Sequence, residues 1–265
     1  MNALALHTWT LDTTPLPDAL AIARRAGWEG IELRRLDFTR AADAGHSAEA
    51  VLGQVRASGL GVACVGVDHG WMWAEGDERR RLLSVFAEQC ARAAALGCDL
   101  VMSPVDRGRG TVTQAGASVR EVGDIAAEHG VRVAIEFNSQ CEQLNALAPM
   151  REVLARAGHP RCGLLLDTYH IGRSGCTLAE LDDVAPAEIV YVQYSDVPHG
   201  ALTPGQVLNR LPPGRGIVPF RELFALMRAK PYTGYLSYEA PNTEAWKRDP
   251  AEVAAEAVAA TRAVL

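Results

Sequence analysis

The stretch GVRVAIEFNSQCEQLNALAPMREVLARAGHPRCGLLLD, residues 130–167, contains one complete strand–helix–strand unit. The aliphatic runs at 132–137 and 163–167 predict two short buried strands, and the apolar spacing near 149–157 predicts a helix between them. Gly158 follows that helix, where the backbone commonly needs a positive φ. Because a crossover helix returns the chain to the same edge of a sheet, this unit predicts two parallel strands.

The same unit recurs along the whole chain. Eight strands are predicted, at 4–8, 30–33, 61–67, 100–103, 132–137, 163–167, 189–194 and 235–239. Helical patterns lie near 16–26, 47–58, 78–96, 114–129, 149–157, 178–183, 219–229 and 250–264. Eight alternating units predict an α/β fold, a single (β/α)8 TIM barrel that spans residues 1–265 as one domain. A doubly wound parallel sheet is the structural alternative.

Composition and charge narrow the class of protein. The net charge of −6 argues against a nucleic-acid-binding surface, which needs a basic stripe. No apolar run approaches the roughly 18 residues of a membrane span, so no membrane partner is expected. The first residues lack the basic region and cleavage site of a secretory signal, which favours a cytoplasmic protein. The six cysteines form no CxxC pair and are expected to be reduced.

Polar side chains end four consecutive predicted strands. These are Glu136, Asp167, Gln193 and Glu239. In a TIM barrel the C-terminal ends of the strands meet at one mouth, where active sites are built. Any one of these acids could simply be a helix cap or a salt-bridge partner, although Glu is a poor N-cap. Together they form an oxygen-rich set that suits Mn²⁺, Mg²⁺ or another hard divalent ion.

Three histidines and a tryptophan are further candidates for the mouth. His7 and His69 stand at predicted strand ends and are candidate substrate-binding residues. His170 follows Asp167 by three residues, which places both just after the same strand. Trp71, after the third strand, could stack on the apolar face of a sugar ring, or could equally pack within a loop or an interface.

The ordered motifs resemble the xylose-isomerase-like barrel superfamily of sugar isomerases and epimerases. The resemblance rests on the motifs Ala134-Ile135-Glu136, Asp167-Thr168-Tyr169-His170 and Pro213-Gly214-Arg215-Gly216, and on the stretches 27–33 and 234–239. It implies one divalent metal ion (Mn²⁺, Mg²⁺, Co²⁺ or Zn²⁺) held at Glu136, Asp167, Gln193 and Glu239. Gln193 departs from the more common His, but an amide oxygen is still a ligand for a hard cation.

The resemblance also implies a reaction in carbohydrate metabolism. A metal-dependent isomerase or epimerase would remove a proton next to the carbonyl of a sugar-like substrate. Glu136 and Glu239 would act as acid and base besides binding the metal. His170 would orient the substrate or act as an acid, and Arg215 would approach the substrate's oxygens. The sequence leaves the oligomeric state open, a homo-oligomer included.

Three other functions are weighed against this one. A dehydratase of a cyclic keto acid or inosose, such as a 3-dehydroshikimate dehydratase, would use the same enolate and expel hydroxide. A DNA-repair endonuclease on the same barrel would need three zinc ions and many histidines at the mouth. Only a few of the seven histidines in this chain could reach the mouth. A non-catalytic barrel that serves as a partner subunit is a further alternative, because Gln193 departs from the usual ligand.

Overall fold

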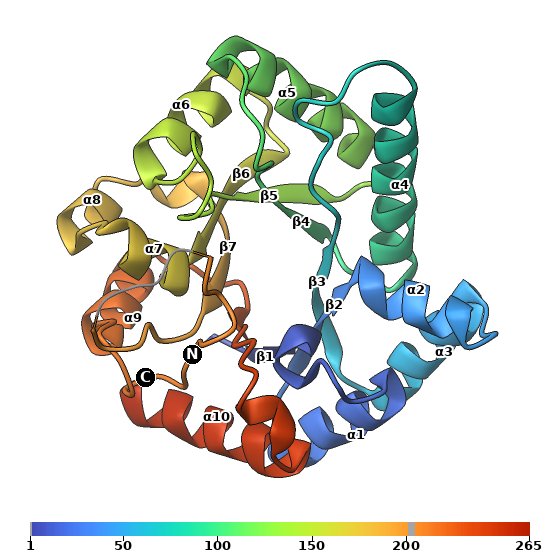
Figure 1. Cartoon of the computed structure of the whole chain (residues 1–265), viewed down its shortest axis with the longest axis vertical. Helices are drawn as coiled ribbons and strands as arrows, with labels where there is room; N and C mark the ends of the chain where they lie inside the picture. The colour runs from blue at the N-terminus through green and yellow to red at the C-terminus, as the bar shows by residue number, and fades with distance from the viewer. Residues whose placement is uncertain (1, 201–204) are drawn as a thin grey trace.

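The computed structural model describes residues 2–200 and 205–265, which form a closed barrel of eight parallel strands (Figure 1). The strands are β1 Leu4–His7, β2 Gly30–Arg34, β3 Gly61–Gly66, β4 Leu100–Pro104, β5 Arg132–Glu136, β6 Cys162–Asp167, β7 Ile189–Tyr194 and β8 Leu236–Tyr238. Each strand pairs with the next, and β8 pairs with β1. The predicted TIM barrel is therefore confirmed, and closure rules out the doubly wound sheet.

Helices surround the barrel on its outside (Figure 1). They are α1 Leu16–Ala26, α2 Arg35–Asp43, α3 Ala48–Ser58, α4 Gly76–Ala95, α5 Val112–Glu128, α6 Leu147–Ala157, α7 Thr168–Ser174, α8 Leu178–Asp182, α9 Phe220–Ala229 and α10 Pro250–Val264. Three 3₁₀ turns complete the described chain, η1 Thr8–Leu11, η2 Pro186–Glu188 and η3 Ala245–Lys247. Within residues 2–200 and 205–265, none of the helices has both the length and the apolar character to cross a bilayer.

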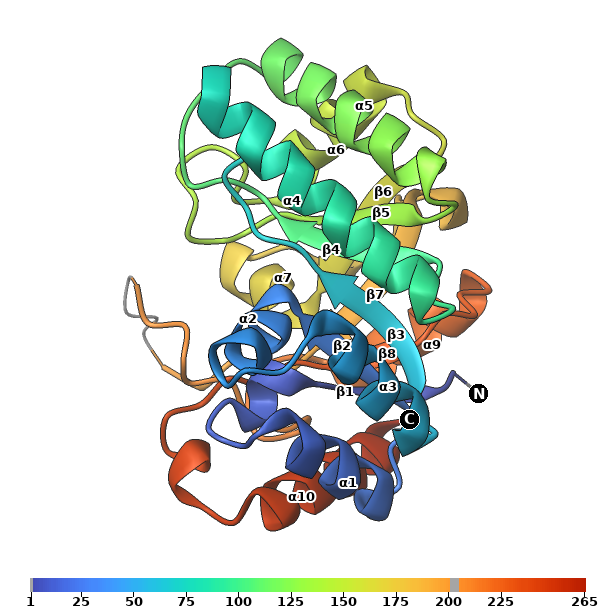
Figure 2. The same cartoon turned by 90° about the vertical axis from the view of Figure 1, so that its right-hand side faces the viewer.

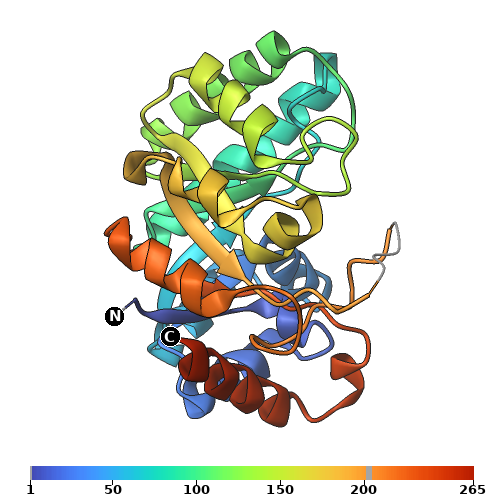
Figure 3. The same cartoon turned by 90° about the vertical axis from the view of Figure 1, so that its left-hand side faces the viewer.

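The last helix lies beside the first, so the two ends of the chain meet. Figure 2 shows α10 alongside α1, and Figure 3 shows β1 starting close to where α10 ends. Trp28, just before β2, donates from its indole nitrogen to the carbonyl of Ala254 at 3.2 Å and stacks on Tyr238. These contacts pack the C-terminal helix against the first strands and the last strand.

Two short helices were not expected from the sequence. α2 follows β2 directly and buries only Asp37 and Phe38, so it has almost no apolar periodicity to detect. α7 begins at Thr168, where the Asp167 side chain accepts a hydrogen bond from the backbone of Tyr169 and caps the helix. Helix α7 carries His170. Asp167 therefore has two roles, as the cap of α7 and as a site residue.

The register shifts at two of the strands that carry site residues. β2 pairs Ile31 with Val62 but Glu32 with Cys64, and β6 pairs Leu164 with Ile189 but Leu165 with Tyr191. An extra residue in the partner strand increases the local twist and re-aims the side chains that follow. After the second shift Asp167 lies beside Gln193, so these two side chains reach the mouth together.

Asp196 anchors the long segment between β7 and α9. Its buried carboxylate accepts backbone hydrogen bonds from Val197 and Val218 at 2.9 Å and from Gly216 at 2.7 Å. A side chain at Gly216 would collide with the carbonyl of Val197, so only glycine fits there. The backbone of Asp196 also pairs with that of Leu211. This anchor fixes the position of residue 210 at the barrel mouth.

We predict that Asp196→Asn destabilises the protein, because its amide nitrogen would face the Gly216 N–H and leave that buried donor unsatisfied. The expected loss is about 1–3 kcal/mol of unfolding free energy, measured by urea unfolding. Asp183→Asn changes an exposed side chain and is the matched control, for which no change is expected. Equal unfolding midpoints for the two variants would contradict the anchoring role.

Candidate active site

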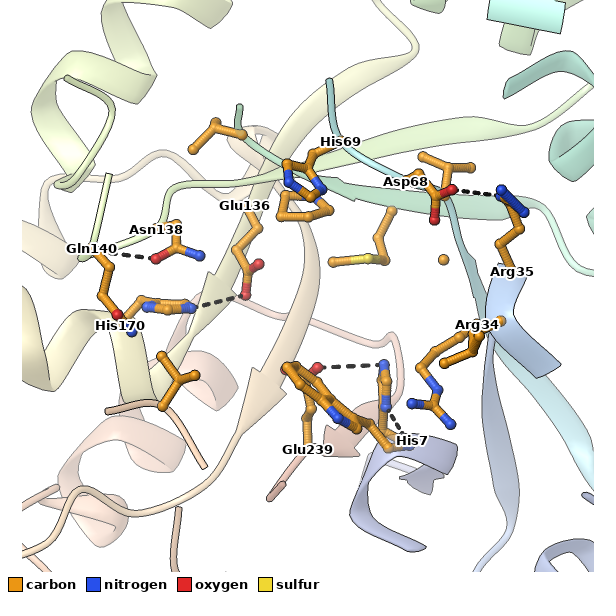
Figure 4. A pocket seen from close by; sticks show the side chains of 18 of the residues that line it. His7, Arg34, Arg35, Asp68, His69, Glu136, Asn138, Gln140, His170 and Glu239 are labelled. Atoms are coloured by element: carbon orange, nitrogen blue, oxygen red, sulfur yellow. Dashed lines mark hydrogen bonds and ion pairs between the residues drawn. The ribbon is translucent and has the colours of Figure 1, made fainter. Parts of the chain in front are cut away.

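A cavity of about 490 Å³ opens at the mouth of the barrel (Figure 4). Its walls come from the C-terminal ends of the strands and the loops after them. The polar and charged residues that line it are His7, Asp12, Arg34, Arg35, Asp68, His69, Arg107, Glu136, Asn138, Gln140, His170, Arg210 and Glu239. This is the end of the barrel at which (β/α)8 enzymes build their active sites.

Glu136 and His170 form the first acid–histidine pair at this cavity. Glu136 ends β5, and its Oε1 lies 3.7 Å from His170 Nε2. The other ring nitrogen, Nδ1, accepts a hydrogen bond from the backbone of Ser139 at 3.3 Å, so the ring proton is on Nε2. Burial lowers the pKa of His170 to about 3, which leaves it neutral. His170 therefore points an N–H at Glu136 (Figure 4).

Glu239 and His7 form a second pair of the same kind. Glu239 directly follows β8, and its Oε1 lies 3.5 Å from His7 Nε2. The Nδ1 atom of His7 accepts from the backbone N–H of Trp9 at 3.0 Å, which again leaves the proton on Nε2. Burial, followed by Arg34 and Arg210, holds the pKa of His7 well below its usual value. The two pairs face the same cavity from different strands (Figure 4).

Arg210 bridges two of the acids. Its Nη1 atom lies 2.6 Å from Asp167 Oδ2 and 2.9 Å from Glu239 Oε2. The guanidinium also lies over the ring of Tyr169, 4.5 Å from the centroid, and its side chain is only 3% exposed. A buried guanidinium in this position neutralises carboxylates that would otherwise be costly to bury.

The expected fourth ligand, Gln193, makes a different contact. Its amide nitrogen donates to Glu32 Oε1 at 2.8 Å, while the hydroxyl of Tyr191 donates to Glu32 Oε2 at 2.9 Å. Burial, and next the nearby Glu239, raise the pKa of Glu32 to about 8. Glu32 therefore orients the amide group of Gln193, and the amide oxygen of Gln193 has no hydrogen-bond partner.

The acids of the site have divergent pKa values. Burial and the neighbouring Asp167 raise the pKa of Glu136 well above its usual value. Burial also raises the pKa of Glu239, to about 7, although Arg210 opposes the shift. Burial disfavours the charged form of Asp167 as well, but Arg210, His170 and the hydrogen bonds to Asp167 together outweigh burial and lower its pKa. Such separation of pKa values is typical of acid–base sites.

The side chains fit a divalent cation. Oxygens of Glu136 and Asp167 and a nitrogen of His170 lie within 4.8 Å of one another. Glu136 Oε1 and Gln193 Oε1 are buried and have no hydrogen-bond partner. Buried acceptors without a donor are rare in folded proteins, and a cation beside either atom would supply the missing partner. Oxygen ligands of this kind suit a hard divalent ion.

Two residues expected to bind substrate do not line the cavity. Trp71 is 1% exposed, donates to Ser103 Oγ at 2.9 Å and packs on Phe86, so its ring has no free face toward the cavity. The Arg215 side chain is 67% exposed and lies near Glu256. His69, by contrast, lines the cavity, as does His7. Trp71 is therefore loop packing, which the sequence had left as an alternative, and Arg215 is a surface residue.

The sequence did not single out Arg210, Arg34 or Asn138. Arg210 and Arg215 stand in the same loop, five residues apart, and no periodic pattern separates them. Only the folded loop turns one inward and the other to solvent. The Glu32 side chain does end a predicted strand, but its partners come from β7 and could not be inferred from β2 alone.

Comparison with known proteins places the chain in a family. The model of the xylose isomerase-like TIM barrel family matches residues 20–264. The chain belongs to this family. An IOLI protein whose crystal structure holds a bound zinc atom superimposes with a TM-score of 0.86 at 18% identity, and the match covers 99% of both chains.

Two relatives within reach of sequence comparison are enzymes. An inosose isomerase of Halalkalibacterium halodurans is 30% identical over 124 residues, which is 45% of this chain and 43% of that protein. A 3-dehydroshikimate dehydratase of Pseudomonas putida is 27% identical over 126 residues, 46% of this chain and 19% of that protein. The matched segments thus span less than half the length of either relative. These relatives support an enzyme in this family.

We predict that Tyr191→Phe destabilises the protein by about 1–2 kcal/mol, because one buried oxygen of Glu32 loses its donor. Urea unfolding at pH 7 measures the difference. Tyr235→Phe removes a hydroxyl from a half-buried tyrosine at the opposite end of the barrel, and a near-zero effect is expected for this control. A Tyr191 variant as stable as the control would show that the Glu32 network adds nothing to stability.

Proposed function

We propose that this protein is a divalent-metal-dependent isomerase or epimerase of an uncharged polyhydroxy ketone, an inosose or a free ketose. The observation that carries the proposal is the presence of two acid–histidine pairs, Glu136–His170 and Glu239–His7, at one cavity. A reaction that removes a proton from one carbon and returns it at the same or the next carbon needs two such groups.

The residues that would hold the metal are Glu136, Asp167, Gln193 and Glu239. A bound divalent ion would polarise the substrate carbonyl and stabilise the negative charge that develops on its oxygen. The free acceptor atoms of Glu136 and Gln193 support this role. Which ion is native, Mn²⁺, Mg²⁺, Co²⁺ or Zn²⁺, is a question for metal analysis.

The protein's own side chains would carry the proton. Glu136 or Glu239 would take it from the carbon next to the carbonyl, and the other would return it. The pKa of Glu239, raised by burial to about 7, favours this exchange, because a carboxyl group whose pKa is near neutrality both accepts and donates a proton readily. Burial raises the pKa of Glu136 as well. His170 and His7 each direct an N–H into the site and would orient the substrate or the acid beside them.

The charge balance of the cavity favours a substrate without an anionic group. Arg34 pairs with two acids: its Nη1 lies 2.6 Å from Asp12 Oδ1, and its Nη2 lies 3.1 Å from Asp37 Oδ1. The Nε atom of Arg35 lies 2.5 Å from Asp68 Oδ2. Arg210 is held by two acids in the same way. Arg107, at the rim, is exposed. Because the inner arginines are already paired with acids, Arg107 at the rim is, among the described lining residues, the arginine left to meet a phosphate or carboxylate.

Hydroxyl groups have better partners in the cavity. Asn138 and Gln140 line it and offer uncharged donors and acceptors, and His69 lines it as well (Figure 4). Side-chain amides bind hydroxyls in both directions, since each carries a donor and an acceptor. A polyol ring fits this lining better than a keto acid does.

We predict that Glu136→Gln and Glu239→Gln each slow the reaction by about 10²–10⁴-fold, because each removes one of the two proton carriers. Exchange of the substrate's proton next to the carbonyl in D₂O, followed by NMR, measures the step directly. Glu142→Gln changes an exposed acid and should leave the exchange rate unchanged.

The outcome of that experiment discriminates between functions. Wild-type exchange rates in both glutamine variants would contradict the proposed acid–base roles. An ultraviolet-absorbing enone and loss of water would identify a dehydratase, the activity named for the Pseudomonas putida relative. Absence of turnover and exchange across a panel of inososes and ketoses with added metal would favour the non-catalytic barrel.

We further predict a preference for uncharged substrates. Burying an unpaired anion costs several kcal/mol, so kcat/KM for a neutral inosose or ketose should exceed that for a ketose phosphate or dehydroshikimate by roughly 10²-fold or more. Steady-state assays with matched compounds test this. Faster turnover of the phosphorylated or carboxylated compound would contradict this preference. It would show that the cavity arginines leave their ion pairs with acids to bind an anionic substrate.

A further inference from the structure

The guanidinium of Arg210 and a divalent metal would need the same carboxylate oxygens. Nη1 lies at hydrogen-bond distance from Asp167 Oδ2 and Glu239 Oε2, which belong to two of the four expected ligands. The other oxygens of these acids are engaged elsewhere. Asp167 Oδ1 accepts from the backbone of Tyr169 at 2.9 Å, and Glu239 Oε1 lies 3.5 Å from His7.

In the metal-free protein Arg210 is the main compensation for a concentrated negative charge. Glu136, Asp167 and Glu239 are all buried around it. The guanidinium of Arg210 contacts two of these acids, with Nη1 2.6 Å from Asp167 Oδ2 and 2.9 Å from Glu239 Oε2. Without it, the buried carboxylates would have to hold protons or take up another cation.

The backbone of Arg210 is fixed, but its side chain is held only at the far end. The Arg210 carbonyl accepts from the side chain of Asn242 at 2.9 Å, and its N–H donates to Pro241 at 3.3 Å. The Nε atom, in contrast, has no hydrogen-bond partner. The head group is retained by the two acids and by the ring of Tyr169, and it borders the cavity. Rotation about the side-chain bonds would move it into the cavity without moving the loop.

We propose that Arg210 competes with the divalent metal: it neutralises Asp167 and Glu239 in the metal-free protein, and metal binding displaces its guanidinium toward the cavity. The inference rests on the proposed metal site. Two cations that share carboxylates in a buried site repel each other, so each weakens the binding of the other. Arg210 therefore keeps the site folded before metal arrives and lowers the affinity for the metal.

The test compares metal-free preparations of the wild type, Arg210→Met and Arg210→Lys. Titration with Mn²⁺ and Zn²⁺ in competition with a fluorescent chelator gives the dissociation constants, and thermal unfolding gives Tm with and without metal. Arg210→Met should bind metal at least about tenfold more tightly, although its metal-free Tm falls. Arg210→Lys keeps the charge but loses the fork of donors, so intermediate values are expected.

Arg215→Met is the matched control, because Arg215 follows Arg210 by five residues but is 67% exposed and lies near Glu256, away from the expected ligands. Its metal affinity should equal that of the wild type. A purely structural role of Arg210 would lower Tm without tightening metal binding.

The outcomes separate this inference from the proposed function. Equal or weaker metal binding by Arg210→Met and Arg210→Lys, relative to a wild type that binds, would overturn the competition and leave the metal site standing. No binding by any variant at millimolar Mn²⁺ or Zn²⁺ would overturn the metal site and the competition together. Tighter binding by Arg210→Met with a lower metal-free Tm supports the competition.

Discussion

Negative charge buried at the mouth of the barrel is the constraint on which the rest of this site depends. Glu32, Glu136, Asp167 and Glu239 are all at most 6% exposed, and strand ends place them close together. Carboxylates at such depth need hydrogen bonds, protons or cations. Glu32 is satisfied by Tyr191 and Gln193, whereas Asp167 and Glu239 share Arg210. Glu136 Oε1 is left without a partner, and it is there that a cation is most needed.

One segment of the chain contributes both to the stability of the fold and to the candidate active site. The segment between β7 and α9 is tied down by Asp196, whose carboxylate accepts three backbone N–H groups. The same segment carries Arg210 to the centre of the site and pairs with residues after β8. The anchor matters here because the guanidinium that the segment carries bridges two acids, one at the end of β6 and one directly after β8. The anchor and the bridging residue are thus parts of one structural unit.

Much of the fold was predictable because each strand–helix unit carries its own signal. The apolar runs and the glycines after the helices predicted all eight strands and their order, and the closed barrel is confirmed. Helices α2 and α7 escaped prediction because they are short and have little apolar periodicity. The strand-end residues Glu136, Asp167, Gln193 and Glu239 were found because parallel strands in a barrel all end at one mouth. Their metal-binding role remains a proposal.

The sequence by itself determined the barrel, the family and the set of strand-end side chains at its mouth. Only the tertiary structure decided how those side chains are paired. The sequence motif pointed to Arg215, yet it is Arg210 that is buried between two acids, whereas Arg215 is mostly exposed. Gln193 looks like an isolated ligand until β2 brings Glu32 to its amide. The reason is physical: strand periodicity is local and readable, whereas charge compensation depends on contacts between residues far apart in the chain.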